Sequence, residues 1–438
     1  MNRSIGRWQG AGRARRTAVA AATLSLALVA AACGGPGGGG SGDGGGDVPG
    51  VTDDTIKIGT TQPLTGPAAP GYARISKAME AYFDHVNAEG GIHGRKIELI
   101  VEDDGYNPTI TAEKTRKLVL QDKVFALAGA LGTPTHTAVL DFIRQNKVPD
   151  LMVSSGSLSW NQPEKYPYTF GWQTDYIREG KILATYAQKE FEGKTFCSFG
   201  QGDDLGADGV KGVETVLGGD ALKAKETYSV SNTNVAPQIG KLQAAGCDVV
   251  FGFMIPGFTA LALGTSAQLG YKPQWVISSV GADPASLAGY LKENAEALTQ
   301  GVIGALYLPV IEENNSWIKL FTEINEKYSD GAALDYTSLH GYAMAYAIAQ
   351  ALAAAGEDPT RESLIEAMED GAVSRGPSPT PYAYAADDHS GMTGSYVTQI
   401  DKLKVKVLTP PMVTDDGDGP VEEHTEPEEE APANGVPE

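Results

Sequence analysis

The chain has 438 residues, of which roughly 360 have the composition of a folded body, more than one hydrophobic core usually holds. This length predicts two lobes, and the hydrophobic and aromatic contents of 42% and 8% are those of a packed soluble protein. The net charge is −21 and no basic stripe occurs in the body, which argues against a nucleic-acid-binding surface.

Residues 1–33 have the pattern of a secretion signal. Five arginines and no acidic residue precede an apolar run over 17–32, which ends in small residues. A transmembrane anchor is the alternative, but the run is shorter than the ~20 residues that span a bilayer. The order basic, apolar, small favours a signal that is removed on export.

Cys33 ends this leader and follows small residues, as in a bacterial lipobox, although Ala30 stands where the usual leucine would be. The glycine-rich stretch over 34–53 is typical of a flexible tether. We therefore expect a lipid on Cys33 to attach an extracytoplasmic protein to the cell membrane. Ordinary secretion, with Cys33 incidental, is the alternative.

From residue 55 onward, strand and helix patterns alternate. The first unit predicts strands over 55–61, 96–103, 124–131 and 151–154, with helices over 72–89 and 110–121 and after Thr133. The same rhythm restarts near residue 195, with strands over 195–199, 222–230, 249–254 and 275–279. Such alternation predicts parallel sheets with right-handed crossovers.

The predicted fold class is α/β, with two doubly wound parallel-sheet lobes joined by a multi-strand hinge. Lobe one is expected over 54–172 and 308–410, and lobe two over 173–307. A long apolar helix over 334–355 is expected to return to lobe one, and a β-hairpin over 394–400 and 402–408 to follow it.

The C-terminal residues 411–438 are predicted to be a disordered acidic tail. From Asp415 onward they include ten acidic residues, four prolines and no lysine or arginine. Cys197 and Cys247 are both expected in lobe two. Export permits a disulfide between them, but their spacing leaves a bridge and two buried thiols equally open.

Three segments in order resemble a known family: TIKIGTTQPLTGPAA, NAEGGIHGRKIELIVEDDGYNP and AGALGTPTHTAV. They are similar to the type I periplasmic binding proteins of the branched-chain amino acid (Leu/Ile/Val-binding) family, and the resemblance extends over about 54–408. It implies a venus-flytrap fold that captures a small-molecule ligand and delivers it to an ABC permease in the membrane.

Thr133 is the first candidate for a ligand contact. It ends an apolar strand and begins a helix with Pro134, where a hydroxyl and free N–H groups face the mouth of the strand. In the family, the hydroxyl residue at this position contacts the ligand carboxylate. A plain capping threonine is the alternative.

The next strand is followed by Ser155, Gly156 and Ser157, which match family positions that contact the ligand. Three other positions depart from the amino-acid binders. Leu158 replaces a hydroxyl residue, Leu205 a tyrosine and Val280 an acidic residue that would hold the ligand ammonium group. A buried ammonium without such partners would be costly, and Asp283 is better explained as a helix cap.

The expected cleft is instead aromatic and apolar, which is typical of small-molecule pockets. The candidates are Trp160, Phe170, Trp172, Tyr176, Phe253, Met254, Phe258 and Tyr307, and core packing is the alternative for each. We therefore expect a ligand with a carboxylate or carbonyl end held by lobe one and an apolar or aromatic body held by lobe two.

No sequence motif indicates catalysis, a cofactor or a metal. The six histidines lack a metal-ligand spacing, and neither a nucleophile elbow nor a phosphate-binding loop occurs. We expect a solute-binding receptor and not an enzyme. The alternatives are an amino-acid binder proper and a ligand sensor that acts on a membrane partner.

Overall fold

The computed structural model describes residues 48–329 and 331–437, and these residues belong to one compact unit. The predicted leader, most of the predicted tether and the candidate lipidation site Cys33 lie outside the described residues. In the described part of the chain, no helix has both the length and the apolar character needed to cross a membrane.

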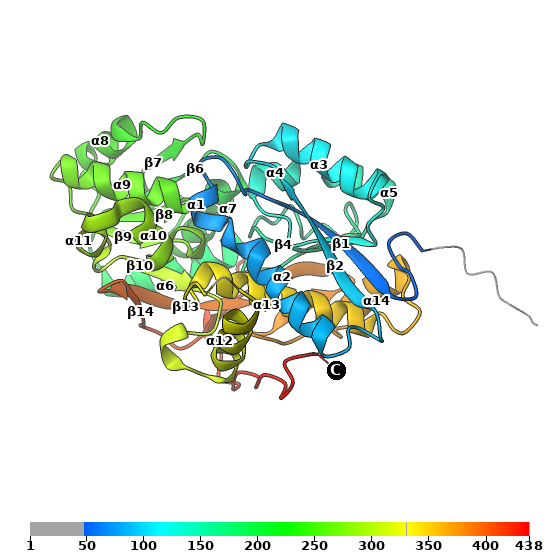
Figure 1. The fold of residues 1–438 in the computed structure, drawn as a ribbon. Coiled ribbons are helices and arrows are strands. Elements are labelled where there is room, and N and C mark those ends of the chain that lie inside the picture. Colours follow the sequence, from blue (N-terminus) through cyan, green and yellow to red (C-terminus); the bar gives the residue numbers. More distant parts are fainter. Residues whose placement is uncertain (1–47, 330, 438) are drawn as a thin grey trace, which may run out of the picture. The chain divides into compact units, whose positions relative to one another are not determined.

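The first sheet is parallel and has the strand order β2-β1-β3-β4-β5. The apolar segment predicted as a buried strand supplies β3 at its centre, where every residue is buried. We call this sheet and its helices lobe one (Figure 1). The strands are β1 (Thr55–Gln62), β2 (Lys96–Asp103), β3 (Ala126–Ala128), β4 (Asp150–Val153) and β5 (Thr169–Gly171).

Helices from two distant parts of the chain belong to lobe one. The long apolar helix α13 returns to lobe one, as predicted. It packs on α2 so closely that a Cβ at Gly341 would lie 2.4 Å from the carbonyl oxygen of Ile75. The helices are α1 (Ala69–Tyr72), α2 (Arg74–Ala88), α3 (Pro108–Leu120), α4 (Thr133–Thr137), α5 (Leu140–Asn146), α12 (Ser316–Tyr328), α13 (Tyr336–Ala354) and α14 (Arg361–Glu369).

The second sheet has a parallel part in the order β7-β6-β8-β9-β10. We call this sheet and its helices lobe two. Its strands are β6 (Phe196–Gln201), β7 (Leu222–Tyr228), β8 (Val249–Phe253), β9 (Gln274–Ile277) and β10 (Ile303–Leu306). Its helices are α6 (Tyr176–Glu190), α7 (Asp204–Leu217), α8 (Ala236–Ala244), α9 (Pro256–Gln268), α10 (Pro284–Leu291) and α11 (Ala295–Thr299).

Cys197 of β6 and Cys247, just before β8, form a disulfide, with their Cα atoms 5.8 Å apart. The sequence had left this bridge open. Strands β6 and β8 are neighbours in the sheet, and Cys197 lies beside Val250 in their register. The bridge therefore joins two adjacent strands of lobe two at their buried ends.

The predicted terminal hairpin is present but belongs to the second sheet and not to lobe one. Strand β13 (Gly394–Asp401) pairs antiparallel with β10, and β14 (Lys404–Val407) pairs with β13. Pairing with β13 satisfies the backbone groups of β10 that would otherwise face outward at a sheet edge. A separate two-stranded sheet contains β11 (Tyr382–Ala385) and β12 (Asp388–Met392).

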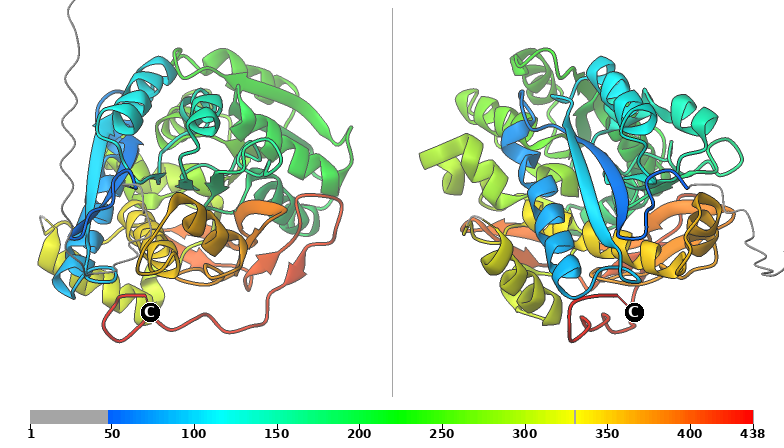
Figure 2. Two further views of the ribbon diagram at one scale, coloured as in Figure 1. Left: turned by 90° about the vertical axis from the view of Figure 1, so that its right-hand side faces the viewer. Right: turned by 45° about the vertical axis from the view of Figure 1, so that its right-hand side comes forward.

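The C-terminal segment, residues 411–437, has defined contacts instead of the disorder expected from its composition. Strands β15 (Met412–Val413) and β16 (Glu422–Glu423) extend the second sheet beyond β13. Farther along, Trp317 donates its indole N–H to the carbonyl of Glu429 over 2.6 Å, and Tyr82 donates to the carbonyl of Gly435 over 2.8 Å. Figure 2 shows this segment in red, running from lobe two to the yellow helices of lobe one.

Each sheet has a topological switch point, where successive connections leave toward opposite edges of the sheet. These points lie between β1 and β3 in lobe one and between β6 and β8 in lobe two. Ligands of open α/β sheets bind beyond the carboxyl ends of strands at such points. Thr133 follows β3, and Leu205 and Met254 follow β6 and β8. The topology therefore brings several of the predicted contacts to the region between the lobes.

Candidate functional site

A cavity lies between the two lobes, at the carboxyl ends of their strands. Lobe one contributes residues from β1–β4 connections and from α13, and lobe two contributes the segments after β6, β8 and β9. The lining residues are Tyr72, Ile75, Tyr106, Leu131, Gly132, Thr133, Ser154, Gln173, Tyr176, Leu205, Ile255, Pro256, Ser279, Val280, Asp283, Ser286, Leu306, Tyr307, Leu308, Tyr336, Thr337 and His340.

Three hydroxyl groups meet at one end of this cavity. The side-chain oxygens of Thr133 and Ser155 lie 2.8 Å apart, and the hydroxyl of Tyr176 lies 3.5 Å from Thr133 and 3.3 Å from Ser155. Burial raises the pKa of Tyr176 to about 12, so its hydroxyl keeps its proton at neutral pH. We call Thr133, Ser155 and Tyr176 the hydroxyl cluster.

The glycine between the two serines of the predicted motif explains how Tyr176 reaches the cluster. The backbone N–H of Tyr176 donates to the carbonyl of Gly156 over 2.8 Å. A Cβ at Gly156 would lie 2.8 Å from the ring of Tyr176 and 2.9 Å from the carbonyl of Thr174. Only a residue without a side chain allows this close approach.

Gln173 supplies a further donor to the cavity. Its side chain is 3% exposed, and its amide nitrogen has no hydrogen-bond partner among the described residues. An amide N–H₂ that is buried without a partner costs free energy, and most such groups in proteins are paired. A ligand oxygen at this end of the cavity would satisfy it.

His340 of α13 lines the cavity as a neutral ring. One ring nitrogen lies 2.8 Å from the hydroxyl of Ser154 and the other 3.0 Å from the hydroxyl of Tyr307. Burial lowers the pKa of His340 to about 4, so it carries no charge at neutral pH. Among the described residues that line the cavity, none is lysine or arginine.

Two buried acids lie on the lobe-two side. Asp283 caps α10, as the sequence predicted, by accepting from the N–H groups of Ala285 and Ser286, and it is also the only acid among the described lining residues. Glu179 lies behind the lining and accepts from the N–H and hydroxyl of Ser279 at 2.7 and 2.6 Å. Burial raises the pKa of both acids, that of Glu179 to about 7.

The predicted contacts divide into two groups. Thr133, Leu205 and Val280 line the cavity. Ser155 belongs to the hydroxyl cluster but lies outside the lining, and Gly156 positions Tyr176 through its carbonyl. Three others lie away from the lining. Ser157 donates to Asp204 of α7 over 2.8 Å, Met254 packs in the core of lobe two, and Trp172 is fully buried near His340 and Tyr382. Their contact with a ligand stays a prediction.

Of the aromatic candidates, Tyr176 and Tyr307 line the cavity. Trp160, Phe170 and Phe253 are buried in the cores of the lobes, as the packing alternative expects. Sequence reasoning missed His340 and Gln173. No local pattern distinguishes His340 in its apolar helix. Gln173 directly follows Trp172 at the crossing between the lobes, and a single amide beside aromatic residues is the signal that could identify it.

A family model described as periplasmic binding protein matches residues 55–404. Among curated proteins, the chain is similar to Leu/Ile/Val-binding protein homolog 7 of Brucella melitensis, with 23% identity over 58% of this chain and 64% of that relative. The chain thus spans less than two thirds of that relative's length. Leu/Ile/Val-binding protein homolog 1 of Brucella abortus is 27% identical over 77% of this chain and 87% of that protein.

Three solved structures share the fold. A fatty acid ABC transporter substrate-binding protein from Thermomonospora curvata has a TM-score of 0.75 at 23% identity, over 85% of this chain and 95% of that one. A branched chain amino acid ABC transporter from Thermus thermophilus with bound valine has a TM-score of 0.72 at 18% identity, over 84% of this chain and 98% of that one. A solute binding protein from R. palustris in complex with 4-hydroxybenzoate has a TM-score of 0.69 at 18% identity, over 83% of this chain and 98% of that one.

The family model covers most of the chain, and the two lobes with a cavity between them agree with it. The chain therefore belongs to the periplasmic binding protein family, as its resemblance to the type I, Leu/Ile/Val-binding members predicted.

Proposed function

We propose that the protein is an extracytoplasmic receptor that captures a small organic carboxylate between its lobes and delivers it to an ABC permease. The observation that carries this proposal is the hydroxyl cluster, where Thr133, Ser155 and Tyr176 converge at one end of the interlobe cavity. Hydroxyl and amide donors stabilise a carboxylate without a cation when several of them reach it.

Gln173 adds to this support, because its unpaired amide nitrogen lines the same cavity. A ligand carboxylate has two oxygens and about four acceptor positions. Thr133, Tyr176 and Gln173, which line the cavity, offer side-chain donors for these positions. The remaining lining, which includes Ile75, Leu205 and Val280, is suited to an apolar body.

The lining offers little to the ammonium group of an amino acid. Asp283 is the single acid among the described lining residues, and its carboxylate already accepts from two backbone N–H groups and from the hydroxyls of Ser286 and Thr337. Burial also raises the pKa of Asp283, which weakens it as a counter-ion. We therefore favour a carboxylate without an amino group over an amino acid.

The ligands named for the three structural relatives are valine, a fatty acid and 4-hydroxybenzoate. Each has a carboxylate and an apolar body, and they differ in the ammonium group and in the shape of the body. The proposal for this chain includes only the two features that these ligands share, a carboxylate and an apolar body. One fold hosts different ligands, so the choice among them depends on the residues of this cavity.

Isothermal titration with hexanoate, benzoate and leucine tests the proposal. We expect hexanoate or benzoate to bind more tightly than leucine, and hexanamide to bind more weakly than hexanoate. Thr133→Val should weaken carboxylate binding about 10- to 100-fold, because a hydrogen bond to a charged group contributes about 1.5–3 kcal/mol. Thr137→Val is the matched control, since Thr137 of the same helix lies outside the cavity lining and bonds only the carbonyl of Thr133.

Tight leucine binding with no binding of either simple carboxylate would replace the proposal with an amino-acid binder. If Thr133→Val and Thr137→Val change the carboxylate affinity equally, the hydroxyl cluster does not bind the ligand carboxylate.

We further propose that a lipid on Cys33 holds the receptor at the membrane. The support is the run of small residues before Cys33 and the glycine-rich stretch after it. Expressed in a bacterial host, the protein should partition into detergent phase, and Cys33→Ala should move it to the aqueous phase. Detergent partition that is the same for both forms would contradict lipid attachment.

A further inference from the structure

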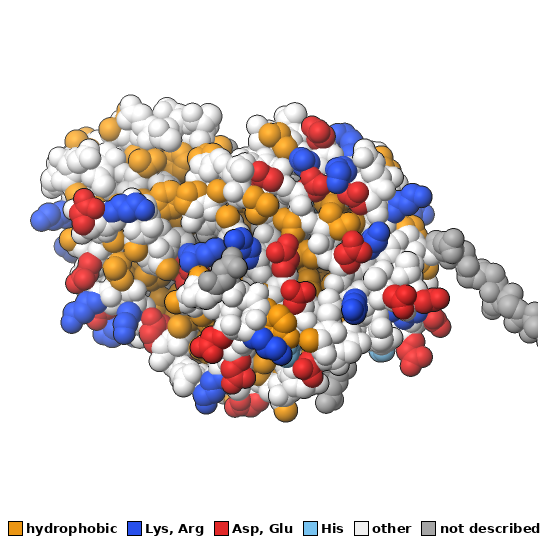
Figure 3. Space-filling view, in the orientation of Figure 1, with side chains coloured by type: hydrophobic (Ala, Val, Ile, Leu, Met, Phe, Trp, Pro, Cys, Tyr) orange, Lys and Arg blue, Asp and Glu red, His pale blue; other side chains and the backbone are white. Residues whose placement is uncertain are grey.

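A second hollow shares lining residues with the cavity. It has a volume of about 590 Å³, and among the described residues that line it none is charged. Lobe one contributes Pro67 and Pro70 at α1, and lobe two contributes Leu261 and Tyr290 of α9 and α10. Figure 3 shows apolar side chains gathered where Figure 1 places α1, α9 and α10. We call this hollow the outer groove.

The outer groove adjoins the cavity. Tyr106 and Ile255 line both spaces, one from each lobe. The ring of Tyr106 lies against Gly132, where a Cβ would be 2.6 Å from it, and Gly132 directly precedes Thr133 of the hydroxyl cluster. One aromatic side chain therefore extends from the polar end of the cavity to the groove.

Tyr106 is held in this position by an uncommon backbone conformation. Its φ of 60° lies in the left-handed region that non-glycine residues rarely adopt, and its N–H donates to Asp104 over 2.9 Å. Residues held in such conformations cluster at ligand sites, where the surrounding structure fixes them. The conformation brings a large apolar ring to the junction of the two spaces.

The floor of the groove is also fixed. The ring of Phe258 stacks on Tyr228 with centroids 4.0 Å apart, and the hydroxyl of Tyr228 accepts from the N–H of Ile255 over 3.1 Å. Across the groove, the hydroxyl of Tyr290 donates to the carbonyl of Pro67 over 3.1 Å and so links the lobes. Residues of both lobes therefore form the walls of the groove.

From this arrangement we infer that the ligand is an amphipathic carboxylate whose unbranched hydrocarbon chain leaves the cavity between Tyr106 and Ile255 and lies in the outer groove. The inference rests on the proposed function, since it takes the carboxylate to be held at the hydroxyl cluster. A chain occupies the groove better than a protein surface would, because the groove shares Tyr106 and Ile255 with the ligand cavity and both lobes form its walls.

A chain-length series of saturated carboxylates, from four to twelve carbons, tests the inference by titration calorimetry on the full mature chain. Each methylene that enters an apolar site contributes roughly 0.8 kcal/mol, which corresponds to about a three- to fourfold gain in affinity. We expect affinity to rise at about this rate beyond the length that fills the cavity, and then to level off when the groove is full.

Leu261→Glu introduces a charge into the groove on α9, so it should flatten the rise with chain length while butanoate affinity stays within twofold. Leu269→Glu is the matched control, because Leu269 follows the same helix, is 42% exposed and lies outside the groove. It should leave the whole series unchanged.

Two outcomes separate this inference from the proposed function. If no carboxylate of any length binds, the proposed function fails. If butanoate binds but longer chains gain nothing, or if Leu261→Glu leaves the rise intact, the inference about the groove is overturned while the proposed function stands. Binding to phosphatidylcholine vesicles that Leu261→Glu abolishes, without any chain-length effect, would overturn it in favour of a lipid surface.

Discussion

Lys181 of α6 donates a hydrogen bond of 2.8 Å to the carboxylate of Asp415, although these residues are 234 positions apart. The side chain of Lys181 is only 1% exposed, and its ammonium group also donates to the carbonyls of Asp415 and Gly417. All three donors of a buried cation are thus satisfied by the C-terminal segment.

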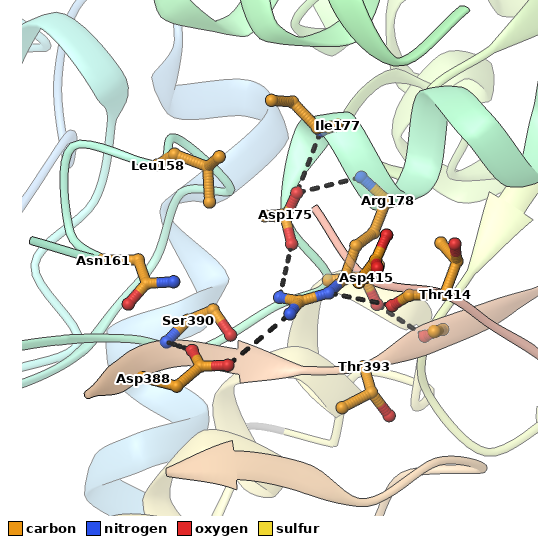
Figure 4. Close-up of polar contacts among 12 residues, drawn as sticks. Leu158, Asn161, Asp175, Ile177, Arg178, Asp388, Ser390, Thr393, Thr414 and Asp415 are labelled. Carbon is orange, nitrogen blue, oxygen red and sulfur yellow. Dashed lines mark hydrogen bonds and ion pairs between the residues drawn. The ribbon is translucent and has the colours of Figure 1, made fainter. Parts of the chain in front are cut away.

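The neighbouring cation Arg178 has a similar arrangement, which Figure 4 shows. It forms an ion pair of 2.7 Å with Asp175, lies 3.6 Å from Asp388 of β12 and donates to the carbonyl of Thr414 over 3.0 Å. The acidic C-terminal segment therefore completes two buried cationic sites at the junction of α6 with β12 and β13.

Removal of the C-terminal segment after residue 413 should destabilise the protein. A buried charge that loses its partners costs about 3–5 kcal/mol, so we expect a fall of this size in the free energy of unfolding, measured by urea denaturation. Lys181→Met in the truncated chain should recover part of the loss. A truncated chain as stable as the full one would show that the segment does not support Lys181.

A smaller change isolates Asp415. Asp415→Asn should lower the free energy of unfolding by about 1 kcal/mol at neutral pH, since its side chain is half exposed and the pair is screened. The hydrogen bond from Lys181 lowers the pKa of Asp415 from 3.8, so this contribution is present above pH 3.8 and disappears as the pH falls through the lowered value. Asp418→Asn makes the same charge change at an exposed position and serves as the control.

Asp204 of lobe two forms hydrogen bonds with residues of lobe one. Its carboxylate accepts from the hydroxyls of Ser157 and Ser159, both at 2.8 Å, and these serines follow β4 of lobe one. Such contacts stabilise the closed arrangement of the lobes, and a ligand held between the lobes gains from whatever favours closure.

Asp204→Ala should therefore weaken ligand binding about 5- to 30-fold, because two hydrogen bonds to a charged group contribute at least 1–2 kcal/mol to closure. Most of the change should appear as faster dissociation in stopped-flow measurements. Asp220→Ala, at an exposed position beyond the end of α7, is the control. Unchanged dissociation in Asp204→Ala would mean that these bonds do not limit opening.

The pH dependence of stability should change in Glu179→Gln. Burial raises the pKa of Glu179 to about 7 from 4.5, so the folded state holds a proton that the unfolded state has released between these values. The contribution of Glu179 to stability is thus fully present below pH 4.5 and is lost as the pH rises through 7.

Glutamine resembles the protonated acid, so the stability of Glu179→Gln relative to the wild type should be greater at pH 8 than at pH 5, by roughly 1–3 kcal/mol. Thermal denaturation at the two pH values measures this difference. Glu190→Gln, at the exposed end of the same helix, should show no such difference. An equal offset at both pH values for Glu179→Gln would contradict the raised pKa.

The order of strands and helices could be predicted because each element has its own hydrophobic pattern, and Thr133 could be predicted because it directly follows a buried strand. Contacts between distant residues could not. The hydroxyl of Ser157 is engaged by Asp204, 47 residues away, and no local pattern foretells that pairing. His340 enters the cavity from α13, which sequence alone describes as a core helix.

The C-terminal segment shows a different reason for failure. Its composition lacks the apolar residues that drive folding on its own. Its order comes instead from partners already fixed in the body, among them Lys181, Trp317 and Tyr82. Composition indicates whether a segment is ordered when isolated. It therefore cannot predict the order of a segment that binds to the surface of an already folded body.

Asp208 should make ligand binding depend on pH. It accepts from the N–H of Leu158 of lobe one over 3.2 Å. Burial, followed by the negative charges of Asp204 and Asp175, raises the pKa of Asp208 to about 6, while the N–H of Leu158 and the charge of Lys211 oppose this rise. Opening of the lobes would expose Asp208 and return its pKa toward 3.8. The closed state therefore binds a proton more tightly than the open state, and closure loses this support as the pH rises through 6.

We accordingly expect ligand affinity to be about tenfold higher at pH 5 than at pH 8, since pH 5 lies one unit below the closed-state pKa and one pKa unit corresponds to about 1.4 kcal/mol. Asp208→Asn should remove this difference and keep the tighter value at both pH values. Comparison of wild type and variant with the same ligand cancels any titration of the ligand itself. A pH dependence that survives in Asp208→Asn would assign it to another group and would contradict the role of Asp208 in closure.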